Sequence, residues 1–238
     1  MNRNLPRKVK ATFFRWRLHR VFRPLAYAFE WLARMTALSA WIENNRSFSF
    51  NDYPSGFDYQ KRYQLYEQVR AAEELDDVPV TYLEFGVAAG HSFRWWVSNL
   101  QHPEARFYGF DTFTGLPEDW GPFKAGDMSN GNKPPEIADD RVRFFQGLFQ
   151  KTLPAFLDGQ PLRGRKVIHL DADLYSATLY VLAVLDPYLH TGDLILFDEF
   201  NVPTHEFAAF RDYTRSFYRE MTPIAAVNNY YQTAFRVV

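Results

Sequence analysis

Residues 84–92, with the sequence EFGVAAGHS, join an apolar stretch to a helical one and decide the fold. Residues 81–85 have the apolar and aromatic character of a short strand, and residues 91–100 have helical periodicity. Gly86 and Gly90 let the backbone turn tightly and approach a ligand, and the amides at the start of the helix favour a polar or anionic group. We therefore predict a strand, a ligand-binding turn and a helix. A glycine turn that serves only the packing of strand on helix is the alternative.

Strands of similar length recur along the rest of the chain. The next four are expected, with helical or loop stretches between them, at residues 106–110, 142–146, 166–170 and 194–197. Two further strand-like runs, 223–227 and 233–238, are joined across Asn228-Asn229 and indicate a closing hairpin. Strands that alternate with helices predict a mainly parallel sheet covered on both faces. Ligands are then expected at the carboxyl ends of the strands.

Asp111 closes the strand expected at 106–110, about 20 residues after Gly90. A carboxylate at this place can accept two hydrogen bonds from the hydroxyls of a ribose. A cap of a helix or turn is the alternative for this residue alone. Together with the glycine turn, Asp111 indicates a cofactor that contains adenosine. The third glycine of the dinucleotide pattern is missing, which counts against a cofactor with a pyrophosphate.

Acidic residues follow two later strands at their carboxyl ends. Asp171 comes directly after residues 166–170, and Asp198-Glu199 come directly after residues 194–197. A helix over about 176–189 is long enough to return the chain to a neighbouring parallel strand, so the carboxylates converge. Converging carboxylates repel one another unless a cation or proton intervenes, and oxygen ligands suit Mg²⁺. Helix capping by such residues, Asp173 among them, with exposure to solvent is the alternative.

Composition limits the other classes of function. The chain has 238 residues, 47% of them hydrophobic, which suffices for one α/β domain with an appendage. A net charge of −1 gives no overall attraction to nucleic acid. The absence of cysteine excludes disulfides, thiolate ligands and cysteine nucleophiles, and it fits a reducing compartment. We expect a cytoplasmic protein with one catalytic domain over residues 46–238.

Residues 1–45 form a basic, aromatic extension in which eight Lys or Arg residues precede the first acid, Glu30. An apolar stripe at helical spacing predicts a helix, bent or restarted around Pro24, that contains Phe14, Leu18, Val21, Leu25, Phe29 and Leu32. Charged residues interrupt the apolar runs, so a signal peptide and a spanning helix are not expected. We expect the extension to pack on the core or on a second subunit of a homo-oligomer. A helix on a membrane surface, which would make the protein peripheral to the membrane, is the alternative.

Four segments taken together resemble the macrocin O-methyltransferase family. They lie in this order at residues 84–90, 108–117, 170–175 and 197–200, within a resemblance that covers roughly residues 55–238. The resemblance implies a Rossmann-like class I methyltransferase fold with a mainly parallel, seven-stranded sheet, helices on both faces and the C-terminal hairpin. It also implies methyl transfer from S-adenosylmethionine, with Mg²⁺, to sugar hydroxyls of natural products.

The resemblance also assigns residues to the site. Those that match the cofactor-binding region are Glu84, Phe85, Gly86, Ala88, Gly90, Ser92, Asp111, Thr112, Gln146 and Gly147. Within this set Asp111 matches the acid that binds ribose, and Gln146-Gly147 match the region beside the adenine. The implied metal ligands are Asp171, Asp198 and Glu199. The family carries Asp-Asp at the last pair, whereas Glu199 is one methylene longer.

A hydroxyl is a poor nucleophile near neutral pH, and a divalent ion lowers its pKa and orients its oxygen. A base must then take the proton, and Asp171 is the candidate, with His91, His169 and His205 as alternatives. Residues 114–135, which contain Trp120, Phe123 and Lys124, are expected to form a lid over donor and acceptor. We therefore expect an O-methyltransferase that acts on a small-molecule hydroxyl.

Two other classes of function share part of this pattern. A nicotinamide-dependent oxidoreductase would use the glycine turn and Asp111 but would not need the acidic cluster. A non-enzymatic membrane-surface or scaffold protein could use residues 1–45 on a degenerate fold. Binding of the methyl donor distinguishes the methyltransferase from the oxidoreductase. Deletion of residues 1–45 would abolish the role of a scaffold protein while cofactor binding persists.

Overall fold

The structure, a computed structural model, describes residues 5–238 and contains one mixed sheet. In spatial order the strands are β1 (Phe50–Asn51), β7 (Met221–Val227), β8 (Gln232–Val237), β6 (Leu194–Phe197), β5 (Arg165–Leu170), β2 (Val80–Phe85), β3 (Arg106–Asp111) and β4 (Val142–Gln146). Only β8 runs antiparallel to its neighbours, β6 and β7, because it returns through the hairpin. The predicted Rossmann-like fold is confirmed. The sheet has eight described strands instead of seven, because a two-residue strand such as β1 leaves no periodicity to detect.

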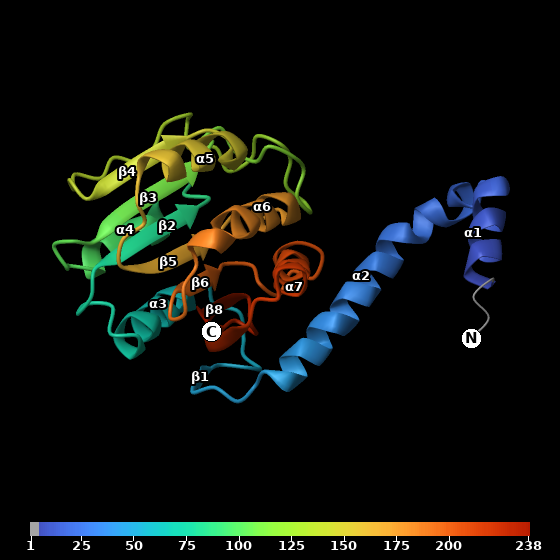
Figure 1. The fold of residues 1–238 in the computed structure, drawn as a ribbon, viewed down its shortest axis with the longest axis horizontal. Coiled ribbons are helices and arrows are strands. Elements are labelled where there is room, and N and C mark those ends of the chain that lie inside the picture. Colours follow the sequence, from blue (N-terminus) through green and yellow to red (C-terminus); the bar gives the residue numbers. More distant parts are fainter. Residues whose placement is uncertain (1–4) are drawn as a thin grey trace.

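Helices cover both faces of this sheet (Figure 1). One face packs against α3 (Lys61–Ala72) and α4 (His91–Asn99). The other packs against α5 (Phe149–Gly159), α6 (Tyr175–Leu185), which continues into a short 3₁₀ turn at Asp186–Tyr188, and α7 (Glu206–Phe217). All six residues of β2 are buried, as expected for a central parallel strand that is covered on both faces. This places the carboxyl ends of β2, β3, β5 and β6 along one edge.

Two helices precede this domain: α1 (Leu5–Arg15) and α2 (His19–Asn44). The predicted restart of the helix around Pro24 is wrong, because Pro24 lies inside α2. The break falls at residues 16–18, where Arg17 has a φ of 49°. The amides of Leu18 and Arg17 donate to the carbonyls of Phe13 and Phe14, which is the Schellman pattern that ends a helix. Arg3, one of the eight basic residues, lies outside the described residues.

The two halves of α2 have different surroundings. Leu38 is buried in the core, and the Trp41 ring lies 4.9 Å from the Phe200 ring and 5.8 Å from the Phe235 ring. At residue 34 the Arg34 guanidinium pairs with Asp212 of α7 at 3.3 Å. The first half of α2 extends away from the domain and carries α1 at its far end (Figure 1). The expected packing on the core is therefore seen only over about residues 34–44, which form part of the domain.

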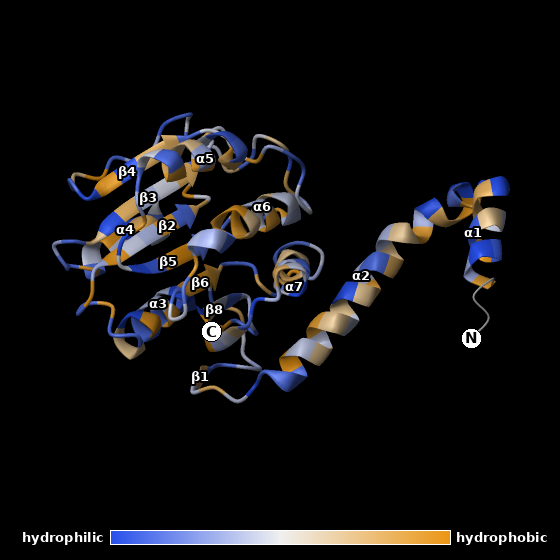
Figure 2. Ribbon diagram, in the orientation of Figure 1, coloured by the Kyte–Doolittle hydropathy of each residue, from blue (hydrophilic) through white to orange (hydrophobic). Residues whose placement is uncertain are grey.

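Figure 2 shows that apolar residues nevertheless recur along α1 and the first half of α2. In α1 no residue is buried, and in α2 only Leu38 is. No helix within residues 5–238 is long and apolar enough to cross a membrane.

Candidate active site

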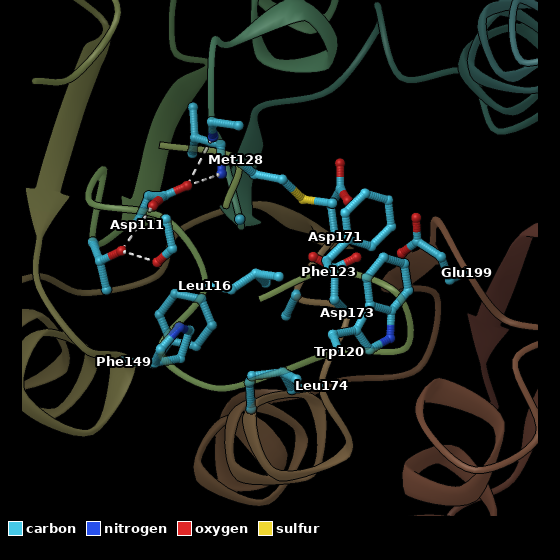
Figure 3. Close-up of a pocket in the computed structure, with 18 of the residues that line it drawn as sticks. Asp111, Leu116, Trp120, Phe123, Met128, Phe149, Asp171, Asp173, Leu174 and Glu199 are labelled. Atoms are coloured by element: carbon cyan, nitrogen blue, oxygen red, sulfur yellow. Dashed lines mark hydrogen bonds between the residues drawn. The ribbon is translucent and has the colours of Figure 1, made fainter. Parts of the chain in front are cut away.

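A cavity of roughly 650 Å³ opens at the carboxyl ends of β2, β3 and β5, where ligands of such sheets are expected. Its volume lies within the range of about 300–1,000 Å³ that is usual for small-molecule sites. The turn after β2 and Asp111 form one end, and Asp171, Asp173 and Glu199 form the other (Figure 3). The cavity therefore joins the two constellations predicted from the sequence.

The turn after β2 is held by Asp111, which ends β3. One oxygen of its carboxylate, Oδ2, accepts hydrogen bonds from the amides of Val87 at 2.8 Å and Ala88 at 2.7 Å. The other, Oδ1, accepts from the amide of Phe113 at 2.6 Å. These turn amides are thus engaged by Asp111, which still borders the cavity. Since each carboxylate oxygen has two lone pairs and three of the four are taken by these amides, Oδ1 of Asp111 retains one acceptor site for a hydroxyl of a ligand.

Gly86 brings the cofactor turn and the acidic cluster close together. Its φ is +94°, and a Cβ at this position would lie 1.7 Å from the backbone carbonyl oxygen of Asp171. Only glycine lets the two chain segments approach this closely. The turn after β2 and the strand end that carries Asp171 therefore touch at this backbone contact.

The residues expected to bind the cofactor separate into two groups. Those that line the cavity are Gly86, Ala88, Ser92, Asp111 and Thr112, and those that do not are Glu84, Phe85, Gly90, Gln146 and Gly147. The three residues that follow Gly147 in the chain, Leu148, Phe149 and Gln150, line the cavity instead. The side-chain amide of Gln146 donates to Oδ1 of Asn132 at 2.8 Å and so ties the end of β4 to the segment at 114–135.

Glu84 lies beneath the turn in a fully buried polar network. Its carboxylate accepts a hydrogen bond from the Ser92 hydroxyl at 2.7 Å and another from the Tyr82 hydroxyl. The Tyr82 hydroxyl also contacts Nδ1 of His169 at 2.8 Å. His169, an alternative base in the sequence analysis, is therefore a core residue of β5, and Glu84 supports the start of α4 through Ser92.

Three carboxylates converge at the other end of the cavity. One oxygen from each of Asp171, Asp173 and Glu199 lies within 4.8 Å of the others, and oxygen Oε2 of Glu199 is buried with no hydrogen-bond partner among the described residues. Burial and the neighbouring Asp198 and Asp173 raise the pKa of Asp171 well above its ordinary range. Burial, with Asp198 again, raises the pKa of Asp173 to about 7.

Burial, together with Asp171 and Asp198, likewise raises the pKa of Glu199. A hard divalent cation would relieve this repulsion, and an oxygen-only set of donors suits such an ion. The residues present therefore fit a magnesium site.

Asp198, predicted as a metal ligand, lies beside this cluster. It is fully buried, and its Oδ2 accepts a hydrogen bond from the Tyr59 hydroxyl at 3.1 Å and lies 3.7 Å from Arg62. The Arg62 guanidinium also donates to the Tyr59 hydroxyl at 2.6 Å. The other oxygen of Asp198, Oδ1, has no hydrogen-bond partner among the described residues, so its role as a ligand stays a prediction. The set within 4.8 Å contains Asp173, which was not predicted as a ligand.

The segment at 114–135 forms one wall of the cavity. Its Trp120 and Phe123 rings are stacked with centroids 5.3 Å apart, and they lie over the acidic cluster (Figure 3). Leu116 and Met128 also face the cavity, and Trp120 packs against the first turn of α6. Lys124 points away and pairs with Asp119 at 2.8 Å. Of the three residues named in the predicted lid, Trp120 and Phe123 line the cavity and Lys124 does not.

The remaining histidines lie at the edge of the site. His91 lines the cavity from the start of α4. The His205 ring packs edge-on against Trp120, with centroids 6.4 Å apart, and burial lowers its pKa, so its neutral form predominates near pH 7. Both remain alternatives to Asp171 as the base.

Three residues of the site, Asp173, Tyr59 and Arg62, were not predicted from the sequence. Asp173 was considered only as a helix cap, although its spacing from Asp171 is a signal of paired carboxylates. Tyr59 and Arg62 line the cavity from the start of α3. No local motif marks these two residues, because only the parallel pairing of distant strands brings α3 beside Asp198.

Comparison with known proteins agrees with this geometry. Residues 83–200 match a family model described as a methyltransferase domain. A tetracenomycin-type rhamnosyl 4'-O-methyltransferase of Streptomyces olivaceus is 39% identical over 66 residues, which cover 28% of this chain and 24% of the relative. Mycinamicin III 3''-O-methyltransferase of Micromonospora griseorubida is 34% identical over 67 residues, covering 28% and 25%. The chain thus matches about a quarter of the length of these curated relatives.

A solved structure shares the whole fold. The calicheamicin methyltransferase CalS11 superposes with a TM-score of 0.58 at 19% identity, over 86% of this chain and 91% of that one. The fold is that of a class I methyltransferase. Within it, residues 83–200 match the methyltransferase domain model, and the resemblance to sugar O-methyltransferases that the sequence indicated is confirmed.

Proposed function

We propose that the protein transfers a methyl group from S-adenosylmethionine to a hydroxyl of a small molecule of the sugar or natural-product type. One observation carries the proposal: a single cavity is bordered by the Asp111 turn at one end and by three converging carboxylates at the other. Donor and acceptor bound at these ends would meet between them. Two curated relatives support this acceptor class: both are named as O-methyltransferases, one of a rhamnosyl-tetracenomycin and the other of mycinamicin III.

The donor end suits an adenosine. Asp111 offers its free acceptor site on Oδ1 to a ribose hydroxyl, and Gly86 and Ala88 line the same end of the cavity. Phe149, which lines the same end, supplies an aromatic ring for a planar base. These residues fix the direction from which the methyl group is presented.

The acceptor end suits a hydroxyl beside Mg²⁺. Asp171, Asp173 and Glu199 would hold the ion, which supplies positive charge that polarises a neighbouring hydroxyl. Asp171 accepts the hydroxyl proton while the oxygen forms a bond to the methyl carbon and the bond from that carbon to sulfur breaks. Trp120 and Phe123 exclude water and give a sugar ring an aromatic surface.

Calorimetric titration with S-adenosylmethionine and S-adenosylhomocysteine, with and without Mg²⁺, tests the donor site. We expect micromolar binding that Asp111→Ala weakens by roughly tenfold to a hundredfold, because a charged hydrogen-bond acceptor is lost. Asp140→Ala, which removes an exposed carboxylate outside the cavity, is the control and should bind as the unchanged protein does. Absence of binding to both ligands would contradict the proposal. Gain of one methyl group by a glycosylated acceptor, measured by mass spectrometry, then tests the reaction.

A further inference from the structure

The projecting segment at residues 5–33, which we call the arm, has an unusually apolar surface. Of the twenty-one large apolar side chains exposed in residues 5–238, eleven lie in the arm: Leu5, Val9, Phe14, Trp16, Val21, Phe22, Leu25, Tyr27, Phe29, Trp31 and Leu32. Isolated exposed apolar residues are common, but such a concentration on one segment marks a surface that binds something.

The apolar stripe of the arm and the packed face of α2 lie on opposite sides of the same helix. In the first half of α2 the stripe contains Val21, Leu25 and Phe29 at helical spacing, whereas Leu38 and Trp41 face the domain in the second half. At about 100° per residue these two sets point in roughly opposite directions. The stripe cannot fold onto its own domain without breaking α2. It can, however, contact a flat surface while the domain stays on the far side of the helix.

The arm is also strongly basic. It contains the seven residues Arg7, Lys8, Lys10, Arg15, Arg17, Arg20 and Arg23 and a single acid, Glu30. In α1, Leu5, Val9 and Phe13 recur along one side of the helix, and Arg7, Lys8, Lys10 and Arg15 lie on the others. Apolar and aromatic residues beside cationic ones are typical of helices that lie in a lipid interface.

Charge decides between a lipid surface and a second copy of the chain. A second copy of the chain would offer its own arm, and pairing two arms, each with seven Lys or Arg residues and one acid, would bring like charges together. An anionic bilayer offers an apolar interior for the stripe and negative headgroups for the flanking Lys and Arg. We propose that the arm binds an anionic lipid surface, with the stripe of Val21, Leu25 and Phe29 inserted and the domain held above it.

Flotation with lipid vesicles tests this proposal on the full chain. We expect binding to vesicles of phosphatidylcholine and phosphatidylglycerol in equal parts, little binding to phosphatidylcholine alone, and a decrease in binding as salt is raised. Leu25→Asp should reduce the bound fraction by about tenfold or more, because the lost burial of one leucine corresponds to at least such a factor. Tyr27→Asp is the matched control: it makes the same change of charge two residues away, on the side of the helix opposite the stripe, and should reduce binding less than threefold.

Three results would overturn the proposal. The first is no flotation with anionic vesicles at low salt, and the second is an equal loss of binding in both variants. The third is a concentration-dependent dimer, measured by light scattering, that Leu25→Asp abolishes while vesicle binding is absent, which would assign the stripe to a second copy. Titration of both variants with S-adenosylhomocysteine shows whether the donor site is intact, so failure of the arm and failure of the proposed methyl transfer are measured separately.

Discussion

Asp173 and Asp198 have opposite surroundings, although both are buried acids beside the same cavity. Asp173 shares its site with Asp171 and Glu199, and burial, together with the charge of Asp198, raises its pKa to about 7. Asp198 has the guanidinium of Arg62 at 3.7 Å and the hydroxyl of Tyr59 at 3.1 Å. Asp173 therefore has no cationic side chain among its described partners, whereas Asp198 is paired with Arg62.

Neutral substitutions of these two residues should have different effects. Asp173→Asn should remove one ligand of Mg²⁺ and lower its affinity by about tenfold to a hundredfold, while the fold is kept or stabilised because repulsion is relieved. Asp198→Asn should instead destabilise the protein by about 3–5 kcal/mol, because it leaves Arg62 buried without its partner. Chemical denaturation and calorimetric titration with Mg²⁺ measure the two effects. Loss of Mg²⁺ binding only in Asp198→Asn would favour the ligand set inferred from the sequence.

At the scale of elements, α2 is held to the domain by its second half. Trp41 packs against five aromatic rings, those of Phe200, Phe207, Phe210, Tyr230 and Phe235. Arg34 adds a partly exposed ion pair with Asp212, and such pairs contribute little. The apolar contacts of Leu38, Trp41 and their neighbours in α2 therefore contribute more to the attachment than the ion pair does.

We expect Trp41→Ala to lower the free energy of unfolding by about 2–4 kcal/mol, somewhat less than for a fully buried tryptophan. Leu25→Ala, in the exposed half of the same helix, should change it by less than about 0.5 kcal/mol. Urea denaturation followed by tryptophan fluorescence or circular dichroism provides the comparison. Similar losses for both variants would show that the arm packs on the domain in solution.

Elements with a clear period could be predicted from the sequence, and those set by distant contacts could not. Strand β4 was expected with the bounds that it has, 142–146, and α4 was expected to within one residue of its end. Strand β1 was missed because its two residues are defined only by pairing with Ala225 and Ala226 of β7. A bend or restart of the helix was expected around Pro24, the residue with the strongest local signal. The helix instead breaks at Arg17, whose left-handed φ of 49° is not predicted by its side chain.

The candidate site follows the same division. The Asp111 turn is local, since the strand that ends at Asp111 pairs with the strand before the turn, and sequence reasoning located it. The acidic cluster depends on which of several nearby acids point into the cavity. Backbone geometry decides this: Asp173 adopts a left-handed φ of 57° at the start of α6 and turns toward Glu199. Side-chain directions of this kind carry no periodic signal.

For the whole molecule, the acidic cluster makes stability depend on pH in an unusual direction. The pKa values of Asp171, Asp173 and Glu199 are raised in the folded protein, so the folded state binds more protons than the unfolded state between the two sets of pKa values. Their contribution to stability is present below the unfolded values and is lost as pH rises through the folded values, which for Asp173 is about 7.

Without divalent ions we therefore expect the temperature of the unfolding midpoint to decrease as pH is raised from about 5 to about 8. The decrease should correspond to a loss of folding free energy on the order of a few kcal/mol. Mg²⁺ should restore the midpoint at the higher pH and have little effect at the lower one, because it competes with protons for the same oxygens. Differential scanning calorimetry with a chelator and with Mg²⁺ checks both expectations. A midpoint that rises with pH in the presence of chelator would contradict them.

The continuity of α2 also bears on how the protein would meet its acceptor. This helix runs unbroken from His19 to Asn44, so a surface that holds the arm also sets the orientation of the domain and of its cavity. A protein fixed in this way searches in two dimensions, and acceptors carried by the same surface are present at a higher effective concentration than those dissolved in bulk water. A weak intrinsic affinity for the acceptor would then suffice, and selectivity for glycosylated molecules bearing a lipid chain would arise from location as well as from contacts inside the cavity.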